Sequence, residues 1–189
     1  MSERIFDDRR AALEEAFFAR QNEALLRQLR ESEAQRTTRG ALAAASGISD
    51  EAVLDRLIAQ GIGPQTLAAL ALAPLVLVAW ADGSLSSQER SAVLSGAHKA
   101  GLKTGEVGHK LLEQWLAQPP GPELLQTWKA YAAALAAGMD APQRAALRAA
   151  VLGQAEAVAE AAGGFLGLGD RVSAAERELL HELGAALGG

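Results

Sequence analysis

The sequence predicts an all-α protein, an orthogonal array of about eight helices with a divergent internal duplication and a long N-terminal helix. Alanine and leucine supply much of the apolar share of 49%, whereas β-branched residues are few and aromatic residues make up only 4%. This composition favours helix over strand. Apolar positions also recur at helical spacing, and proline, glycine and capping residues separate the helical segments.

The long N-terminal helix is predicted from Asp7 to Arg39. Apolar side chains such as Leu13 and Phe17 recur at helical spacing among dense mixed charge, which is typical of an exposed helix with a narrow apolar stripe. Such a stripe docks on the rest of the chain or pairs with another helix, and both options stay open. We therefore expect a protein partner or self-association through this helix.

Capping residues, prolines and glycines place the remaining helices. Two glycines bracket a short helical turn at residues 41–46, and Ser49 or Asp50 caps the helix that follows. Pro64 suits a first helical turn, whereas Pro74 predicts a kink. The predicted ranges are 41–46, 50–57, 64–81, 87–100, 104–117, 122–137, 142–162 and 174–187.

The strongest loop signal is the run QPPGP at residues 118–122. Asp140 and Gln143 flank a first-turn proline and are typical of a capping box. The pattern as a whole predicts two parts, an N-terminal helical arm over residues 1–62 and a helical domain over residues 63–189.

Charge and residue types exclude several classes of function. Residues 1–40 carry eight basic and eight acidic side chains, which leaves 10 basic and 15 acidic side chains in residues 41–189. Because an acidic body disfavours the phosphate backbone, we expect no nucleic-acid partner. The chain has no cysteine, which excludes disulfides, Cys-ligated metals and thiol nucleophiles.

No signal peptide or membrane span is predicted. The first residues, MSERIFDDRR, lack the apolar stretch of a signal peptide. The most apolar run, Leu67 to Ala81, has about 15 residues, against the ~20 that a membrane-spanning helix needs. We therefore expect a cytoplasmic protein.

An acidic turn, WADGSLSSQE at residues 80–89, gives the main functional hypothesis. Its segment Leu85-Ser86-x-x-Glu89 recurs as Val172-Ser173-x-x-Glu176, which suggests the internal duplication. Ser-x-x-Glu before an apolar-periodic segment is typical of a capping box. Alternatively, four carboxylates converge and bind a divalent cation, Ca²⁺ or Mg²⁺, because these ions select carboxylate oxygens. The four candidate ligands are Asp82, Glu89, Asp170 and Glu176.

Residues 64–187 resemble a TerB-like domain, the helical module named for tellurite resistance. The resemblance rests on LAPLVLVAWADGSLSSQERSAVLSGAHKAGL and GGFLGLGDRVSAAERELLHELGAAL, with an apolar helix, an Ala-Asp-Gly turn, a small hydroxyl residue and a glutamate. It implies a non-enzymatic, cytoplasmic protein of bacterial stress response that binds metal through Asp82 and Glu89. The second half reads Gly-Leu-Gly-Asp-Arg, so Asp170 and Glu176 match the pattern less closely.

The N-terminal region resembles the zeta-type inhibitor of bacterial ATP synthase. The resemblance rests on FDDRRAALEEAFF and RGALAAASGIS, although the family's Arg-Asn and Trp-Ala-Ala signature is missing. It implies a partner-binding helix from Phe6 to Phe18, with Phe6, Leu13 and Phe17 as contact residues. A peripheral membrane complex would be compatible with this resemblance.

The remaining candidates have structural interpretations. We expect the three histidines on helix surfaces, and we expect Trp115, Trp128 and Tyr131 in the core. The run GGFLGLG at residues 163–169 lacks the Gly-Lys-Ser/Thr of a phosphate-binding loop and is expected to join two helices. Because no arrangement of a nucleophile with a base is recognisable, we expect that the protein is not an enzyme.

Overall fold

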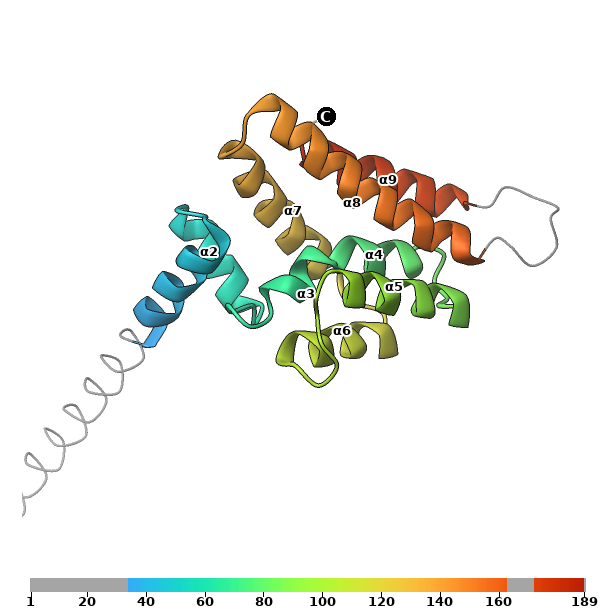
Figure 1. Ribbon diagram of the computed structural model, residues 1–189, viewed down its shortest axis with the longest axis horizontal. Coiled ribbons are helices and arrows are strands. Elements are labelled where there is room, and N and C mark those ends of the chain that lie inside the picture. The colour runs from blue at the N-terminus through green and yellow to red at the C-terminus, as the bar shows by residue number, and fades with distance from the viewer. Residues whose placement is uncertain (1–33, 163–171, 189) are drawn as a thin grey trace, which may run out of the picture. The chain divides into compact units, whose positions relative to one another are not determined.

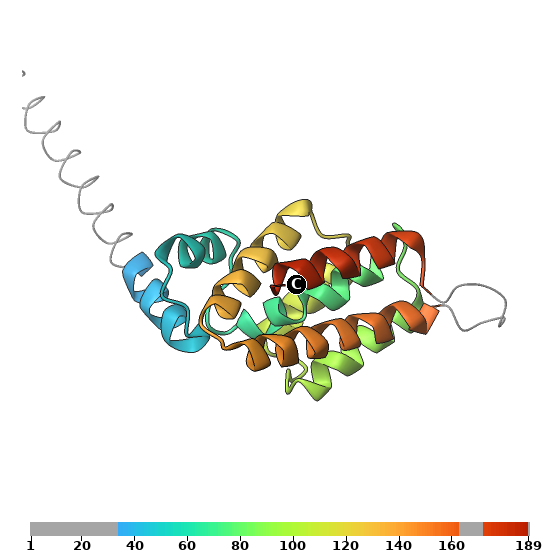
Figure 2. The same cartoon turned by 90° about the horizontal axis from the view of Figure 1, so that it is seen from above.

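The computed structural model describes residues 34–162 and 172–188 of the chain (Figures 1 and 2). Most of the predicted N-terminal helix therefore lies outside the described residues, together with the run GGFLGLG. The candidate site residues that lie outside them are Phe6, Leu13, Phe17 and Asp170.

The all-α prediction is confirmed. Every regular element in the described ranges is a helix, and no strand occurs there. The chain divides into two compact units, residues 1–40 and 41–189, whereas the sequence predicts a boundary between residues 62 and 63. The orthogonal packing and the internal duplication stay predictions.

Residues 34–46 are helical, and eight further helices follow in the described part of residues 41–189 (Figure 1). Their bounds agree with most of the predicted ranges. They are α2 (Glu51–Ala59), α3 (Leu67–Ala71), α4 (Ala73–Ala79), α5 (Ser87–Lys99), α6 (Val107–Ala117), α7 (Pro122–Ala137), α8 (Ala141–Ala162) and α9 (Ala174–Ala186).

Two predicted boundaries are wrong. Gly40 does not end a helix, because the helix of residues 34–46 runs through it and ends at Gly47, which has a φ of 72°. Pro74 does not kink one long helix of residues 64–81. That segment forms two helices, α3 and α4, and Pro74 lies in the first turn of α4. The first turn tolerates proline because its N–H groups have no partner within the helix.

Helix α4 lies at the centre of the fold and is buried on nearly all sides. Its Ala73 and Val78 belong to a core formed with α2, α7, α8 and α9. Its Leu75, Val76 and Ala79 belong to a second core formed mainly with α5 and α6. A helix that is apolar all round is typical of this central position. In both views α8 and α9 lie side by side (Figures 1 and 2).

The tryptophans and the tyrosine fill the core largely as predicted. Trp128 is 2% exposed, and Tyr131 is also buried. Trp115 of α6 is half-buried and packs against both cores. No helix among the described residues has the length and apolar character needed to cross a membrane.

Candidate functional site

The acidic turn, residues 80–89, runs from the end of α4 into the first turn of α5. Asp82 is exposed, and its Oδ1 accepts hydrogen bonds from the backbone N–H of Ser84 at 2.9 Å and from the Ser84 hydroxyl at 3.0 Å. Gly83 follows with a φ of 87°, a conformation that a side chain would strain. The Asp82 carboxylate therefore stabilises the local turn.

Ser86 and Glu89 form a complete capping box at the start of α5. The Ser86 Oγ accepts a hydrogen bond from the Glu89 backbone at 3.1 Å, and Glu89 Oε2 accepts one from the Ser86 backbone at 2.8 Å. Glu89 is only 3% exposed. The capping interpretation of this motif is confirmed.

The other Ser-x-x-Glu motif has the same geometry at the start of α9. Glu176 Oε2 accepts from the Ser173 backbone at 2.5 Å, and Ser173 Oγ accepts from the Glu176 backbone at 3.2 Å. The ψ angles of Ser86 and Ser173, 160° and 165°, are nearly equal. Both motifs therefore begin a helix in the same way.

The metal-binding prediction for these carboxylates stays a prediction. The structure brings Asp82 to Ser84, Glu89 to Ser86 and Glu176 to Ser173, while Asp170 lies outside the described residues. Within residues 34–162 and 172–188, no three His, Asp or Glu side chains form a group that could hold a metal ion. A cation at Glu89 would compete with the Ser86 backbone N–H, whose hydrogen bond Glu89 Oε2 accepts.

The acidic turn, through Trp80, and α5, through Arg90, also hold the end of α6 in place. The Trp80 indole Nε1 donates to the carbonyl oxygen of Trp115 at 3.0 Å, and Arg90 Nη1 donates to the carbonyl oxygen of Leu116 at 3.0 Å. The last carbonyl groups of a helix lack partners within the helix and carry partial negative charge. The two donors therefore fix the position of the last turn of α6.

A groove of about 240 Å³ begins at this fixed end of α6. It lies between the last turn of α6 and the first turns of α7, with the segment after α2 on a third side. Its apolar lining comes from Ile62, Trp115, Pro119, Pro120 and Leu124. Its polar lining comes from Gln60, Gln114, Gln118, Glu123 and Thr127. We call this surface the amide groove.

Exposure separates the floor of the amide groove from its rim. Ile62 and Thr127, each 2% exposed, and Leu124 are buried. Gln60, Gln114, Gln118 and Glu123 are exposed. Three exposed amides and one exposed carboxylate therefore border a buried floor whose apolar surface comes from Ile62 and Leu124.

Prolines set the backbone of the loop that borders the amide groove. Gln118 ends α6 in an extended conformation, with a φ of −142° and a ψ of 139°. A residue before proline is driven towards this region, because the proline ring clashes with a helical neighbour. Pro119, Pro120 and Pro122 have restricted φ angles, and Pro122 begins α7. The loop is therefore a stiff edge.

Glu123 is the one ionisable residue among those lining the amide groove. It lies in the first turn of α7, where the partial positive charge of the helix terminus favours a carboxylate. A Cβ atom at Gly121 would overlap the Glu123 carboxylate. A side chain at position 121 would therefore displace the carboxylate from this position.

Sequence reasoning missed the amide groove and the burial of one histidine. The QPPGP loop indicated one edge of the groove. No sequence motif indicates that the glutamines at positions 60 and 114 lie next to this loop. The histidine prediction is confirmed for His98 and His181, which are exposed, and wrong for His109, which is 9% exposed. Helical spacing alone did not indicate that this face of α6 packs inward.

Comparison of the chain with protein-family models, with curated proteins and with solved structures finds no match. The resemblances to TerB-like domains and to the zeta-type inhibitor of ATP synthase stay predictions.

Proposed function

We propose that this chain is a non-enzymatic helical binding module whose amide groove holds an extended segment of a partner protein. The observation that carries the proposal is that three exposed glutamines, Gln60, Gln114 and Gln118, line one groove together with the buried apolar side chains of Ile62 and Leu124.

Glutamine amides match the chemistry of a polypeptide backbone. Each side-chain amide offers a carbonyl acceptor and an NH₂ donor, which can pair with the N–H and C=O groups of an extended chain. The apolar floor accepts a side chain of the bound segment. At about 240 Å³ the amide groove is smaller than the ~300–1,000 Å³ typical of small-molecule sites, which favours a few peptide residues over a cofactor.

Charge predicts the composition of the bound segment. Because Glu123 is the single ionisable group of the amide groove, its carboxylate favours a segment with lysine or arginine. The stiff proline loop lowers the conformational entropy that binding would otherwise cost. Amides neither donate nor take up protons at neutral pH, so the lining supports binding better than acid–base catalysis.

Selection from a random peptide library with the full chain as bait tests this function. We expect the selected peptides to share a basic residue, and we expect Gln118→Ala and Gln114→Ala to weaken their binding. Gln126→Ala is the matched control, because Gln126 is exposed on α7 and does not line the groove. Selected peptides that bind all three variants equally would contradict the proposal.

The predicted N-terminal arm offers a second route to a protein partner. Its contact residues Phe6, Leu13 and Phe17 are proposed from the sequence pattern and the resemblance given above. Leu13→Glu combined with Phe17→Glu in the full chain should abolish partner capture or self-association through the arm, while peptide binding at the amide groove persists. Unchanged self-association and partner capture would contradict this role.

A role in stress response and a divalent cation at the acidic turns stay proposals that rest on the TerB-like resemblance. Calorimetric titration of the chelator-treated chain with Ca²⁺ and Mg²⁺ tests the cation site. The proposal expects saturable binding that Asp82→Asn combined with Glu89→Gln removes. The capping geometry of Glu89 favours the opposite result, namely lower stability with no change in cation binding.

A further inference from the structure

A second groove, of about 220 Å³, lies between α5 and α8 and reaches α4. Helices α5 and α8 pack against each other at this groove (Figure 2). We call this surface the α5–α8 groove. No residue lines both this groove and the amide groove. An inference about the α5–α8 groove is therefore independent of the function proposed for the amide groove.

Small side chains keep the α5–α8 groove open. Ala92 and Gly96 of α5 are one helical turn apart and share one face of that helix, and Ala157 lines the groove from α8. A Cβ atom at Gly96 would lie 2.8 Å from Cδ2 of Leu75, which is closer than packed carbon atoms approach. Glycine within a helix costs roughly 0.5–1 kcal/mol relative to alanine. At position 96 it allows α5 to approach α4 at the groove.

The bottom of the α5–α8 groove is apolar. Leu75 of α4 and Val158 of α8 line it, and each is only 2% exposed. An occupant that covers these side chains with apolar surface releases water, which is favourable in proportion to the area covered. A volume of about 220 Å³ is below the ~300–1,000 Å³ typical of drug-sized ligands. The groove therefore fits one narrow alkyl chain better than a cofactor.

Lys99 gives the α5–α8 groove a positive charge. It is exposed, and it is the one ionisable residue among those that line the groove. Within residues 34–162 and 172–188, Lys99 forms no ion pair. Ser95 and Gln154 line the same groove and are also exposed, so they add neutral hydrogen-bond donors near its opening.

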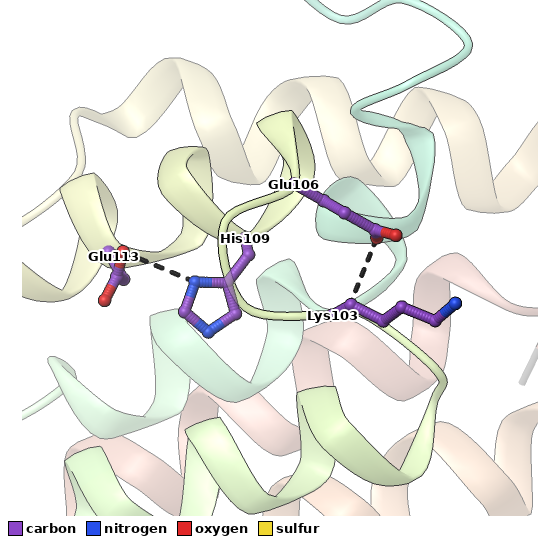
Figure 3. Close-up of polar contacts among 4 residues, drawn as sticks. All are labelled: Lys103, Glu106, His109 and Glu113. Carbon is purple, nitrogen blue, oxygen red and sulfur yellow. Dashed lines mark hydrogen bonds and ion pairs between the residues drawn. The ribbon is translucent and has the colours of Figure 1, made fainter.

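The nearest acidic residues do not compete for Lys99. Glu106, the first acidic residue after Lys99, accepts a hydrogen bond from the Lys103 backbone at 3.2 Å (Figure 3). Glu113 places Oε2 3.3 Å from Nδ1 of His109 (Figure 3). The two glutamates of α8, at positions 156 and 160, are exposed and do not line the groove. The Lys99 ammonium group is therefore available to a bound anion.

The position of Lys99 determines how an occupant lies. Along α5 the lining runs from Ala92 to Lys99, seven residues or about 10 Å of helix, so the charge lies at one end. Lys99 belongs to the last turn of α5, where partial negative charge disfavours a doubly charged phosphate more than a singly charged carboxylate. We propose that the α5–α8 groove binds a medium-chain fatty acid. Its alkyl chain covers Leu75 and Val158, and its carboxylate pairs with Lys99.

Methyl NMR of the full chain, titrated with octanoate below the concentration at which it forms micelles, tests the proposal. We expect the methyl signals of Leu75 and Val158 to shift together and to saturate. Acetate, which has the charge without the chain, should leave these signals in place. Octanol, which has the chain without the charge, should bind more weakly than octanoate. Octanoate binding that leaves both methyl signals unshifted would overturn the proposal.

Two pairs of variants separate the charge from the apolar surface. Lys99→Gln should weaken octanoate binding by roughly three- to fivefold, which is the effect of losing an exposed ion pair, and should not change octanol binding. Lys103→Gln is the matched control, because Lys103 is an exposed lysine outside the lining. Equal octanoate affinity in these two variants would overturn the proposal.

Ala157→Leu places a larger side chain in the α5–α8 groove and should abolish the binding of octanoate and octanol. Its matched control is Ala149→Leu, because Ala149 is exposed on α8 and does not line the groove. Octanoate binding that persists in Ala157→Leu would overturn the proposal. Methyl shifts of Leu75 and Val158 that depend on protein concentration without octanoate would also overturn it, because a second copy of the chain would then cover the groove.

Discussion

The indole Nε1 of Trp80 donates a hydrogen bond to the carbonyl oxygen of Trp115 at 3.0 Å. This bond joins the residue that ends α4 to the last turn of α6. Because Trp115 also lines the amide groove, the bond ties the acidic turn to one wall of the groove. The turn that first suggested a metal site therefore has a structural role in positioning the groove.

Trp80→Phe should lower the free energy of unfolding. The change keeps most of the apolar contacts of Trp80 but removes the donor to the Trp115 carbonyl, which should cost about 1 kcal/mol. Urea unfolding of the two proteins measures the difference. A midpoint that does not move would show that the bond does not fix the end of α6.

Ser86→Ala and Ser173→Ala should each destabilise the protein. Each change removes the oxygen that accepts the N3 backbone N–H, and the typical cost is about 1 kcal/mol. Ser91→Ala is the control, because Ser91 is an exposed residue of α5 at which alanine favours the helix. Equal stability of Ser86→Ala and Ser91→Ala, by urea unfolding, would contradict the capping role of Ser86.

Gly108→Ala and Gly153→Ala should have opposite effects on stability. A Cβ atom at position 108 would lie 3.0 Å from the backbone oxygen of Gln65, and overpacking of this kind typically costs about 1–3 kcal/mol. At position 153 of α8 a Cβ atom has nothing within 4 Å, so alanine should stabilise the helix by roughly 0.5–1 kcal/mol. Thermal unfolding of both variants checks the two signs, and a stabilised Gly108→Ala variant would contradict the close approach of α6 to the backbone of Gln65, just before α3.

The stability of the protein should decrease at high pH because of Tyr131. Burial raises the pKa of its hydroxyl above the ordinary value of 10.0. The unfolded chain then loses the proton first, so the free energy of unfolding falls as pH rises from 10.0 through the raised pKa. Below pH 10.0 the hydroxyl is protonated in both the folded and the unfolded chain, and its contribution to the free energy of unfolding is fully present.

Tyr131→Phe removes this titration and should flatten the decrease. Urea unfolding at a series of pH values from neutral to alkaline compares the two proteins. Parallel pH profiles would contradict the assignment of the effect to Tyr131.

The helix bounds were predictable because prolines and capping residues act locally. QPPGP separated α6 from α7, and the reciprocal bonds between Asp140 and Gln143, at 2.9 and 2.8 Å, match the predicted capping box. Pro74 misled the prediction, because a proline fits a first helical turn as well as a kink and the sequence does not say where the turn begins.

Contacts between distant helices were not predictable from local pattern. The inward direction of His109 depends on how α6 packs on the rest of the fold, which spacing along α6 does not specify. The amide groove brings Gln60 together with Gln114 and Gln118. Helices α3, α4 and α5 lie between Gln60 and the other two glutamines in the sequence. Such a site depends on tertiary packing and carries no sequence motif.

The most direct test of the central claim is ¹⁵N NMR of the full chain titrated with a selected basic peptide. The account predicts that the side-chain amide signals of Gln60, Gln114 and Gln118 shift together and saturate, while that of the control Gln126 stays in place. Glu123→Gln should weaken the same titration. Peptide binding that leaves the three groove amides unshifted would contradict the account and place the binding surface elsewhere on the chain.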